Sequence, residues 1–144
     1  MDAVTLSELR KPRAYPAVSV TAPARRRPIR PERLLAEVRR RLDADDRVAP
    51  GAAEEVVRGL RLALAEADLD RPRDGLVLFA APDGEHHAFP LDQPVEERIV
   101  VDHAFAIRDL VAAHSRTTRH WLVVLSDATD TARLWDGRSD ELTE

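Results

Sequence analysis

The chain has 144 residues, of which 44% are hydrophobic and 33% charged, and its 22 basic and 26 acidic side chains give a formal charge of −4. This balance excludes a strongly basic nucleic-acid binder and most disordered chains, and the length suits one domain with its own core. Because cysteine is absent, disulfides, thiolate metal sites and a cysteine nucleophile are excluded. The N-terminus lacks a basic stretch before an apolar segment, and the apolar runs are strand-sized, which predicts a cytoplasmic protein without a membrane span.

The first third of the chain predicts one turn of helix, one strand and one long helix. Residues 5–8 have capping-box spacing but offer little core. Residues 17–22 place valines on one face and hydroxyl side chains on the other, which predicts a strand that Pro23 closes. Pro31 is suited to the first position of a helix. The apolar residues of this helix recur at helical spacing and are Leu34, Leu35, Val38 and Leu42.

A second helix and a hairpin are expected in the middle of the chain. The helix starts after Pro50 and Gly51. Its buried face is predicted to contain Val56, Val57, Leu60, Ala63, Leu64 and Ala67. Residues 75–81 form a short, continuous apolar run that is typical of a buried central strand. The turn at Asp83 and Gly84 then predicts a hairpin with residues 85–91.

The last third predicts a strand, a third helix and a terminal hairpin. Residues 98–101 are apolar enough for a strand, and Asp102 is placed as the N-cap of the helix that follows. Apolar residues of this helix would include Phe105, Ile107 and Leu110. Residues 121–125 and 132–135 flank a polar turn, which predicts a hairpin.

Together these elements predict an α/β fold. We expect a mixed β-sheet with three main helices, in a single domain that ends in a β-hairpin. The strand at residues 75–81 would lie at its buried centre, with the first two main helices packed on the sheet. The predicted division is an α/β domain over residues 1–119 and a terminal hairpin with its tail over residues 120–144.

Charge is distributed unevenly along the chain. The segment from Arg10 to Arg47 contains twelve basic and five acidic residues, a net charge of +7. Residues 48–144 contain ten basic and nineteen acidic residues, a net charge of −9, and the first nine residues add −2. The sequence therefore describes a basic arm on an acidic body, which permits an RNA-facing side on a protein that is acidic overall.

The strongest candidate binding residues are arginines between the first strand and the first long helix. Their guanidinium groups suit a phosphate backbone, and they are Arg25, Arg26, Arg27, Arg30 and Arg33. The alternative is a solvated loop in an arginine-rich protein. Arginines 39–41 would extend the surface, although Glu37 and Asp43 offer them ordinary pairs within the helix.

No pattern of catalytic or metal-binding residues stands out. The neighbours of Ser115 and Ser126 form neither a nucleophile elbow nor a glycine-rich phosphate loop. His86 and His87 would point to opposite faces of a strand, and His103 and His114 are too far apart along a helix to share an ion. We therefore predict no catalytic residue, no metal site and no cofactor.

Two tryptophans mark the terminal hairpin. Trp121 and Trp135 lie on its two arms, where cross-strand packing is the simplest interpretation. If they are exposed, they indicate a partner surface, including one for a second copy of the chain.

Several stretches, taken in order, resemble one family. They are residues 16–23 (PAVSVTAP), 75–79 followed by Pro82, 89–91 (FPL), 94–97 (PVEE), 100–105 (VVDHAF), 123–126 (VVLS) and 132–137 (ARLWDG). This series is similar to the amino-terminal part of the bacterial homologues of archaeo-eukaryotic release factors, a group that includes the Balon-type ribosome hibernation factors. The resemblance covers most of the chain, and its specificity comes from the order of the pieces.

This resemblance implies a ribosome-associated protein whose amino-terminal domain faces the decoding centre. The final hairpin is similar to the start of the family's middle domain. The chain contains no Gly-Gly-Gln, no Asn-Ile-Lys-Ser and no Tyr-x-Cys element, so neither peptidyl-tRNA hydrolysis nor stop-codon reading is implied for it. The expectation is a noncatalytic domain that associates with the ribosome or its RNA. The alternative is a module for protein interaction or homo-oligomerisation, and a small-molecule enzyme has no motif to support it.

Overall fold

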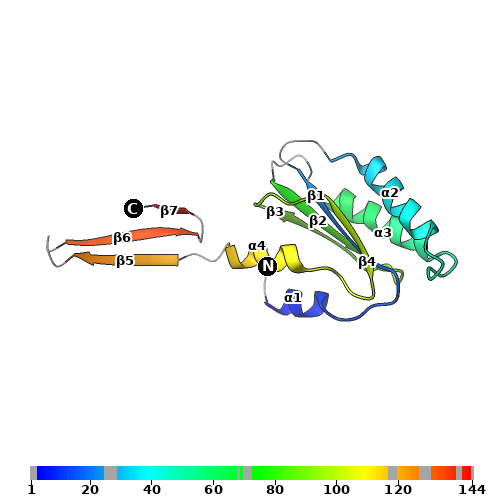
Figure 1. The fold of residues 1–144 in the computed structure, drawn as a ribbon, viewed down its shortest axis with the longest axis horizontal. Helices are drawn as coiled ribbons and strands as arrows, with labels where there is room; N and C mark the ends of the chain where they lie inside the picture. The colour runs from blue at the N-terminus through cyan, green and yellow to red at the C-terminus, as the bar shows by residue number, and fades with distance from the viewer. Residues whose placement is uncertain are drawn as a thin grey trace. The chain divides into compact units, whose positions relative to one another are not determined.

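The computed structural model describes residues 3–24, 29–67, 69, 73–116, 120–126, 131–138 and 141–143. Its contacts group the chain into two units, residues 1–110 and residues 111–144, and each is described by itself. The elements, drawn in Figure 1, are α1 (Ala3–Leu9), β1 (Ala17–Pro23), α2 (Pro31–Asp43), α3 (Ala52–Glu66), β2 (Gly75–Ala80), β3 (His86–Leu91), β4 (Arg98–Asp102), α4 (Arg108–Arg116), β5 (His120–Ser126), β6 (Thr131–Arg138) and β7 (Glu141–Thr143).

The first unit is built on a four-stranded sheet in the order β3-β2-β1-β4. The expected α/β fold with three main helices and a terminal hairpin is confirmed. The prediction of a mixed sheet is wrong in its pairing, because β1 runs antiparallel to both β2 and β4, and β2 runs antiparallel to β3. Two helices in succession, α2 and α3, connect β1 to β2, and each reverses the chain. The second strand therefore returns antiparallel, whereas a single crossover helix would have made it parallel.

Helices α2 and α3 cover one face of this sheet (Figure 1). Every apolar residue predicted for α2 is buried in the core that they form with the strands. Gly59 allows the close approach of α3, since a Cβ at this position would lie 3.1 Å from Cβ of Ala80 in β2. The sequence pattern therefore identified the helices correctly, and the glycine inside α3 has a packing role.

The opposite face is buried as well, and it holds polar side chains with hydrogen-bond partners. Ser19 and Thr21 of β1 are each 3% exposed. The hydroxyl of Ser19 accepts a bond from the backbone N–H of Ala106 (2.8 Å), and that of Thr21 donates to the carbonyl of Glu96 (2.8 Å). These bonds satisfy groups that would be costly to bury alone, so β1 is an interior strand on both faces.

The chain before β1 contributes more to the core than its sequence indicates. The predicted single turn is a seven-residue helix, α1, and Leu9 at its end is only 2% exposed. Arg13, which follows it, lies over the ring of Phe105 with its guanidinium carbon 4.2 Å from the ring centre. The expectation of little core in this region is therefore wrong, because Leu9 is buried and Arg13 covers the ring of Phe105. Figure 1 shows α1 and α4 on the side of the sheet away from α2 and α3.

The third main helix begins five residues later than predicted, because an N-cap at Asp102 would make residue 103 its first residue, whereas α4 begins at Arg108. Asp102 ends β4 instead of capping a helix, and its carboxylate accepts a bond from the backbone N–H of His103 (2.7 Å). Phe105 precedes α4 and is buried, with its ring stacked 4.7 Å from that of Phe79. Phe105 thus packs on the sheet from the segment before α4, although its spacing is typical of a helix.

The second unit contains a small antiparallel sheet in the order β5-β6-β7. Strands β5 and β6 form the predicted hairpin, in which Val123 lies opposite Leu134 and Val124 opposite Arg133. The turn residues 127–130 lie outside the described part of the chain. Across the described residues, the helices are too short or too polar to cross a membrane.

Candidate nucleic-acid interface

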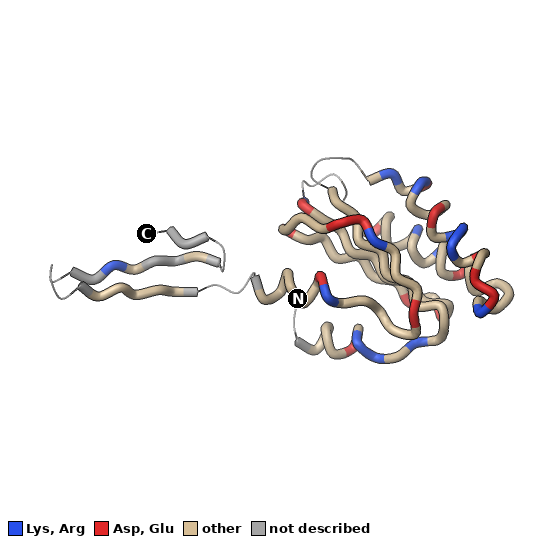
Figure 2. The backbone as a smooth tube through the Cα atoms, viewed as in Figure 1, with Lys and Arg blue, Asp and Glu red and all other residues tan. Residues whose placement is uncertain are grey.

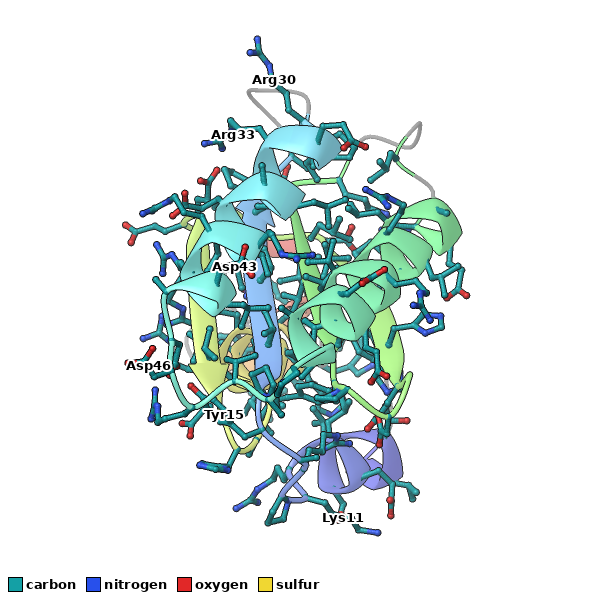
Figure 3. All side chains as sticks on the ribbon, turned by 90° about the vertical axis from the view of Figure 1, so that its right-hand side faces the viewer. Lys11, Tyr15, Arg30, Arg33, Asp43 and Asp46 are labelled. Atoms are coloured by element: carbon teal, nitrogen blue, oxygen red, sulfur yellow. The ribbon has the colours of Figure 1, made fainter. Side chains whose placement is uncertain are left out.

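The structure separates the five arginines of the predicted phosphate site into two groups. Residues 25–27 lie outside the described residues. Arg30 and Arg33 lie together at the N-terminal end of α2 (Figure 3). The side chain of Arg30 forms no helix cap, and among the described residues no carboxylate pairs with it. Within the described part of the chain, this end of α2 therefore presents a cation without a carboxylate partner.

The basic segment from Arg10 to Arg47 does not form one surface. Lys11, next to α1, and Arg30 lie at opposite ends of the first unit (Figure 3). Arg13 is internal, with a side chain only 9% exposed. Its guanidinium donates to both oxygens of Glu85 (2.5 and 2.7 Å). A count of charge along the sequence thus overstates the size of a single basic surface, since it adds arginines with structural roles at the other end of the domain.

Arg47 also has a structural role. It donates two bonds to the Asp45 carboxylate (2.9 and 2.8 Å) and lies over the ring of Tyr15, 4.8 Å from the ring centre. The Tyr15 hydroxyl donates to the same carboxylate. Bonds from Arg47 and Tyr15 hold the pKa of Asp45 well below its usual range, while burial raises the pKa of Tyr15. This cluster anchors the loop after α2 to the segment before β1.

Along α2, arginines and carboxylates alternate (Figure 2). Arg39 pairs with Asp43 at 2.9 Å, as its spacing predicts. Arg40 and Arg41 share Glu37, at 2.7 and 3.0 Å. Their hydrogen bonds lower the pKa of Glu37 to about 2, so this carboxylate is ionised at every physiological pH. One acidic group therefore offsets two guanidinium groups.

Three hollows adjoin along α2 and the neighbouring edge strand β4, and together we call them the α2–β4 trough. Their volumes are about 730, 490 and 450 Å³. The first and second share Arg33 and Glu97, and the second and third share Glu97 and Arg98. Glu97 thus lies where all three meet. The trough follows the open edge of the sheet from the N-terminal end of α2 to the start of α4.

The charged lining of the trough is predominantly basic. Its six arginines are Arg30, Arg33, Arg40, Arg41, Arg98 and Arg108. Its four carboxylates are Glu37, Glu96, Glu97 and Asp109. Asp109 pairs with Arg98 at 2.7 Å and with Arg108 at 3.6 Å, so it is shared as Glu37 is. Shared carboxylates leave guanidinium donors available for an external anion.

Two contacts fix arginines of α2 to the segment that leads into β4. Arg33 pairs with Glu97 across 64 positions of sequence. Arg41 donates to the backbone carbonyl of Ile99 (3.2 Å) in β4. The bond from Arg41 places a charged side chain on the exposed edge of the sheet. Charged side chains at such an edge disfavour pairing with a strand of another molecule.

Sequence reasoning missed Arg98 and Arg108 as members of this site. Both lie in the acidic part of the chain, more than 60 positions after Arg33. They reach the trough because β4 pairs with β1, which places Arg98 opposite Thr21. Counting charges along the sequence does not predict that β4 pairs with β1. Only the strand order of the folded sheet shows it.

The two tryptophans lie on successive rungs of the terminal hairpin. Trp121 is opposite Asp136, whereas Trp135 is opposite Leu122. The side chain of Trp121 is 58% exposed, and that of Trp135 lies outside the described set. An exposed Trp121 fits the partner-surface alternative better than the packing alternative.

The neighbouring histidines of β3 have separate partners, as strand alternation predicts. His87 lies 2.8 Å from Glu85, whereas His86 lies 3.0 Å from both Glu66 of α3 and the carbonyl of Gly84. The Glu66 carboxylate and the Gly84 carbonyl raise the pKa of His86 above its usual 6.5. Within the described residues, no three acidic or histidine side chains are grouped to hold a metal ion.

We expect His86 to make stability depend on pH. A pKa that is higher in the folded state adds stability that is complete below pH 6.5 and is lost as the pH rises through the folded-state pKa. Glu66→Gln should reduce this loss, so that urea unfolding at about pH 5.5 and 8.5 shows a smaller difference than in the wild type. Glu55→Gln, in the same helix but outside this contact, is the control. Equal pH dependence in Glu66→Gln and the wild type would contradict the assignment.

Comparisons with known proteins support the fold alone. No protein-family model and no curated protein matches the chain. A solved structure described as "Archaeal protein" is similar, with a TM-score of 0.56 and 19% sequence identity. The match covers 97% of this chain and 42% of that one, so the chain spans less than half of the similar protein.

Proposed function

We propose that this chain is a noncatalytic domain that binds ribosomal RNA in the cytoplasm through phosphate contacts in the α2–β4 trough. The observation that carries the proposal is the trough lining, in which six guanidinium groups face four carboxylates and Arg30 has no carboxylate partner among the described residues. Planar guanidinium groups bind phosphate through two parallel hydrogen bonds.

The site is suited to a nucleic-acid backbone in shape as well as in charge. The three hollows share lining residues and lie in series, so they fit an extended ligand with repeated negative charges better than one small anion. Arginines 25–27 precede Arg30 in sequence and add three positive charges to the connection between β1 and α2. Because the sequence resembles release-factor homologues, we propose ribosomal RNA as the ligand.

The test is RNA binding by the double variant Arg30→Gln and Arg33→Gln over a range of salt concentrations. Each lost phosphate contact should reduce the slope of log affinity against log salt by about 0.7 to 0.9, and we expect about tenfold weaker binding at moderate salt. Fluorescence anisotropy with a ribosomal RNA fragment measures the slope, and co-sedimentation with ribosomes checks the biological target.

The matched control is Arg39→Gln. Arg39 lies on the same helix and is exposed, but it pairs with Asp43 and lines none of the three hollows. This variant should bind as the wild type does. If the double variant and the control retain the same affinity and salt slope, the trough is not the binding site, and if the wild type fails to co-sediment at low salt, the proposed function is wrong.

A further inference from the structure

Glu97 lies where the three hollows of the α2–β4 trough meet, and it immediately precedes β4. Its carboxylate accepts a hydrogen bond from Nη2 of Arg33, which lies in the first turn of α2. Glu37 and Asp109, by contrast, are each shared between two guanidinium groups. Glu97 therefore stands at the centre of the trough and pairs there with one arginine.

The pair between Arg33 and Glu97 is exposed, which makes it easy to open. The two side chains are 61% and 41% exposed, whereas those of the structural pair Arg13 and Glu85 are 9% and 27% exposed. Exposed ion pairs contribute little to the stability of a fold, because water and salt screen their attraction. The bond also uses only one of the five N–H donors of a guanidinium group. An external anion can therefore replace Glu97 at little cost to the fold.

We propose that Glu97 acts as an internal anion, which occupies the phosphate position of Arg33 until an RNA backbone displaces it; this rests on the proposed function, which supplies RNA as the ligand. A carboxylate and a phosphate both offer a guanidinium group a pair of oxygen acceptors, so they compete for Arg33. After displacement, the Glu97 carboxylate remains close to the incoming phosphates and repels them. It thus lowers the affinity of the trough for every anion.

This competition favours ligands with several phosphates over single small anions. A lone anion at Arg33 has to displace Glu97 with the interactions of one position only. An RNA backbone also reaches Arg30 in the first hollow and Arg98 in the third, and these further contacts offset the cost of displacement. A carboxylate that disfavours the wrong ligand more than the right one increases specificity. Glu97 therefore makes the trough selective for polyanions.

The first test compares Glu97→Gln with Glu96→Gln in the RNA-binding assay. Both variants remove one negative charge from neighbouring exposed positions, but Glu96 lines only the third hollow and forms no ion pair with the described residues. Glu97→Gln should bind RNA about threefold to fivefold more tightly than the wild type, whereas Glu96→Gln should stay within about twofold of it. Equal effects of the two variants would contradict the proposal.

A double-mutant cycle shows whether Glu97 acts through Arg33. In an Arg33→Gln background the contested guanidinium group is absent, so Glu97→Gln should change RNA affinity no more than Glu96→Gln does. If Glu97→Gln strengthened RNA binding equally with and without Arg33, its effect would be one of general charge, and the proposal would be wrong.

The second test uses inorganic phosphate and does not require RNA binding. Titration of the isotope-labelled chain, followed by the amide chemical shifts of residues at the start of α2, measures the affinity for this anion. Glu97→Gln should bind phosphate more tightly than Glu96→Gln by about threefold or more. Equal phosphate affinities would overturn the proposal even if the wild type binds RNA. If the wild type binds no RNA but Glu97→Gln gains phosphate affinity, the proposed function is wrong, and the role of Glu97 as an internal anion stands.

Discussion

Phe79→Ala is expected to lower the free energy of unfolding by about 3–5 kcal/mol, the usual cost of removing a fully buried aromatic ring. The Phe79 side chain is inaccessible to solvent at the centre of the sheet. Its ring stacks on Phe105 at 4.7 Å and meets Phe89 edge-on at 6.0 Å. The substitution therefore removes apolar burial and two ring contacts at once, and leaves a cavity between β2 and the segment before α4.

Urea denaturation, followed by circular dichroism, measures this loss. Phe89→Ala is the comparison, because Phe89 is a partly exposed ring of the same cluster and should cost clearly less. Equal losses of stability in the two variants would contradict tight packing around Phe79 on the second face of the sheet.

The second large effect is expected for Arg13→Ala, which should cost roughly 2–4 kcal/mol. The guanidinium of Arg13 bonds to Glu85, to the carbonyl of Lys11 (2.6 Å) and to the carbonyls of Glu8 and Leu9 (both 3.1 Å). Its removal takes one donor from each of these carbonyls and leaves the Glu85 carboxylate with His87 as its remaining side-chain neighbour. Because Glu85 remains 27% exposed, water offsets part of the loss, and the cost should fall short of that for a fully buried pair.

Two further variants make this prediction specific. Arg13→Lys should recover little stability, since an ammonium cannot form the forked pair with Glu85 or stack on Phe105. Lys11→Ala breaks the exposed pair with Glu8 and should change stability by less than about 0.5 kcal/mol. Thermal unfolding of the three variants separates these outcomes, and a lysine at position 13 that restored full stability would contradict a structural role for the guanidinium geometry.

The local pattern of apolar and turn residues was sufficient to predict individual helices, strands and turns. The apolar spacing in α2 predicted each of its buried residues, and the sharp turn at Gly84, with a φ of 88°, was evident from the pair Asp83-Gly84. The continuous apolar run of β2 likewise predicted a strand buried on both faces. These features depend on the spacing of apolar residues and on the conformational freedom of glycine, and both can be recognised in the sequence itself.

Features that depend on distant pairing were beyond local pattern. The hydroxyl side chains of β1 do not indicate their hydrogen-bond partners, which are the backbone groups of Ala106 and Glu96, 87 and 75 positions later in the sequence. Two of the six arginines of the trough were missed, and Arg98 was missed for the same reason, because it joins the arginines of α2 only through the β1–β4 pairing. In both cases the information lies in strand order, which neighbouring residues do not encode.

The central position of β1 has a consequence for the order in which the sheet is completed. Both neighbours of this early strand come late in the chain, β2 more than 50 residues after it and β4 more than 70. As the chain leaves the ribosome, α2 and α3 emerge while the strand they must cover still has two open edges. The local β2–β3 hairpin can form as soon as it emerges, but the four-stranded sheet closes only after residue 102 is released. Until then, β1 is exposed to contacts with other nascent chains.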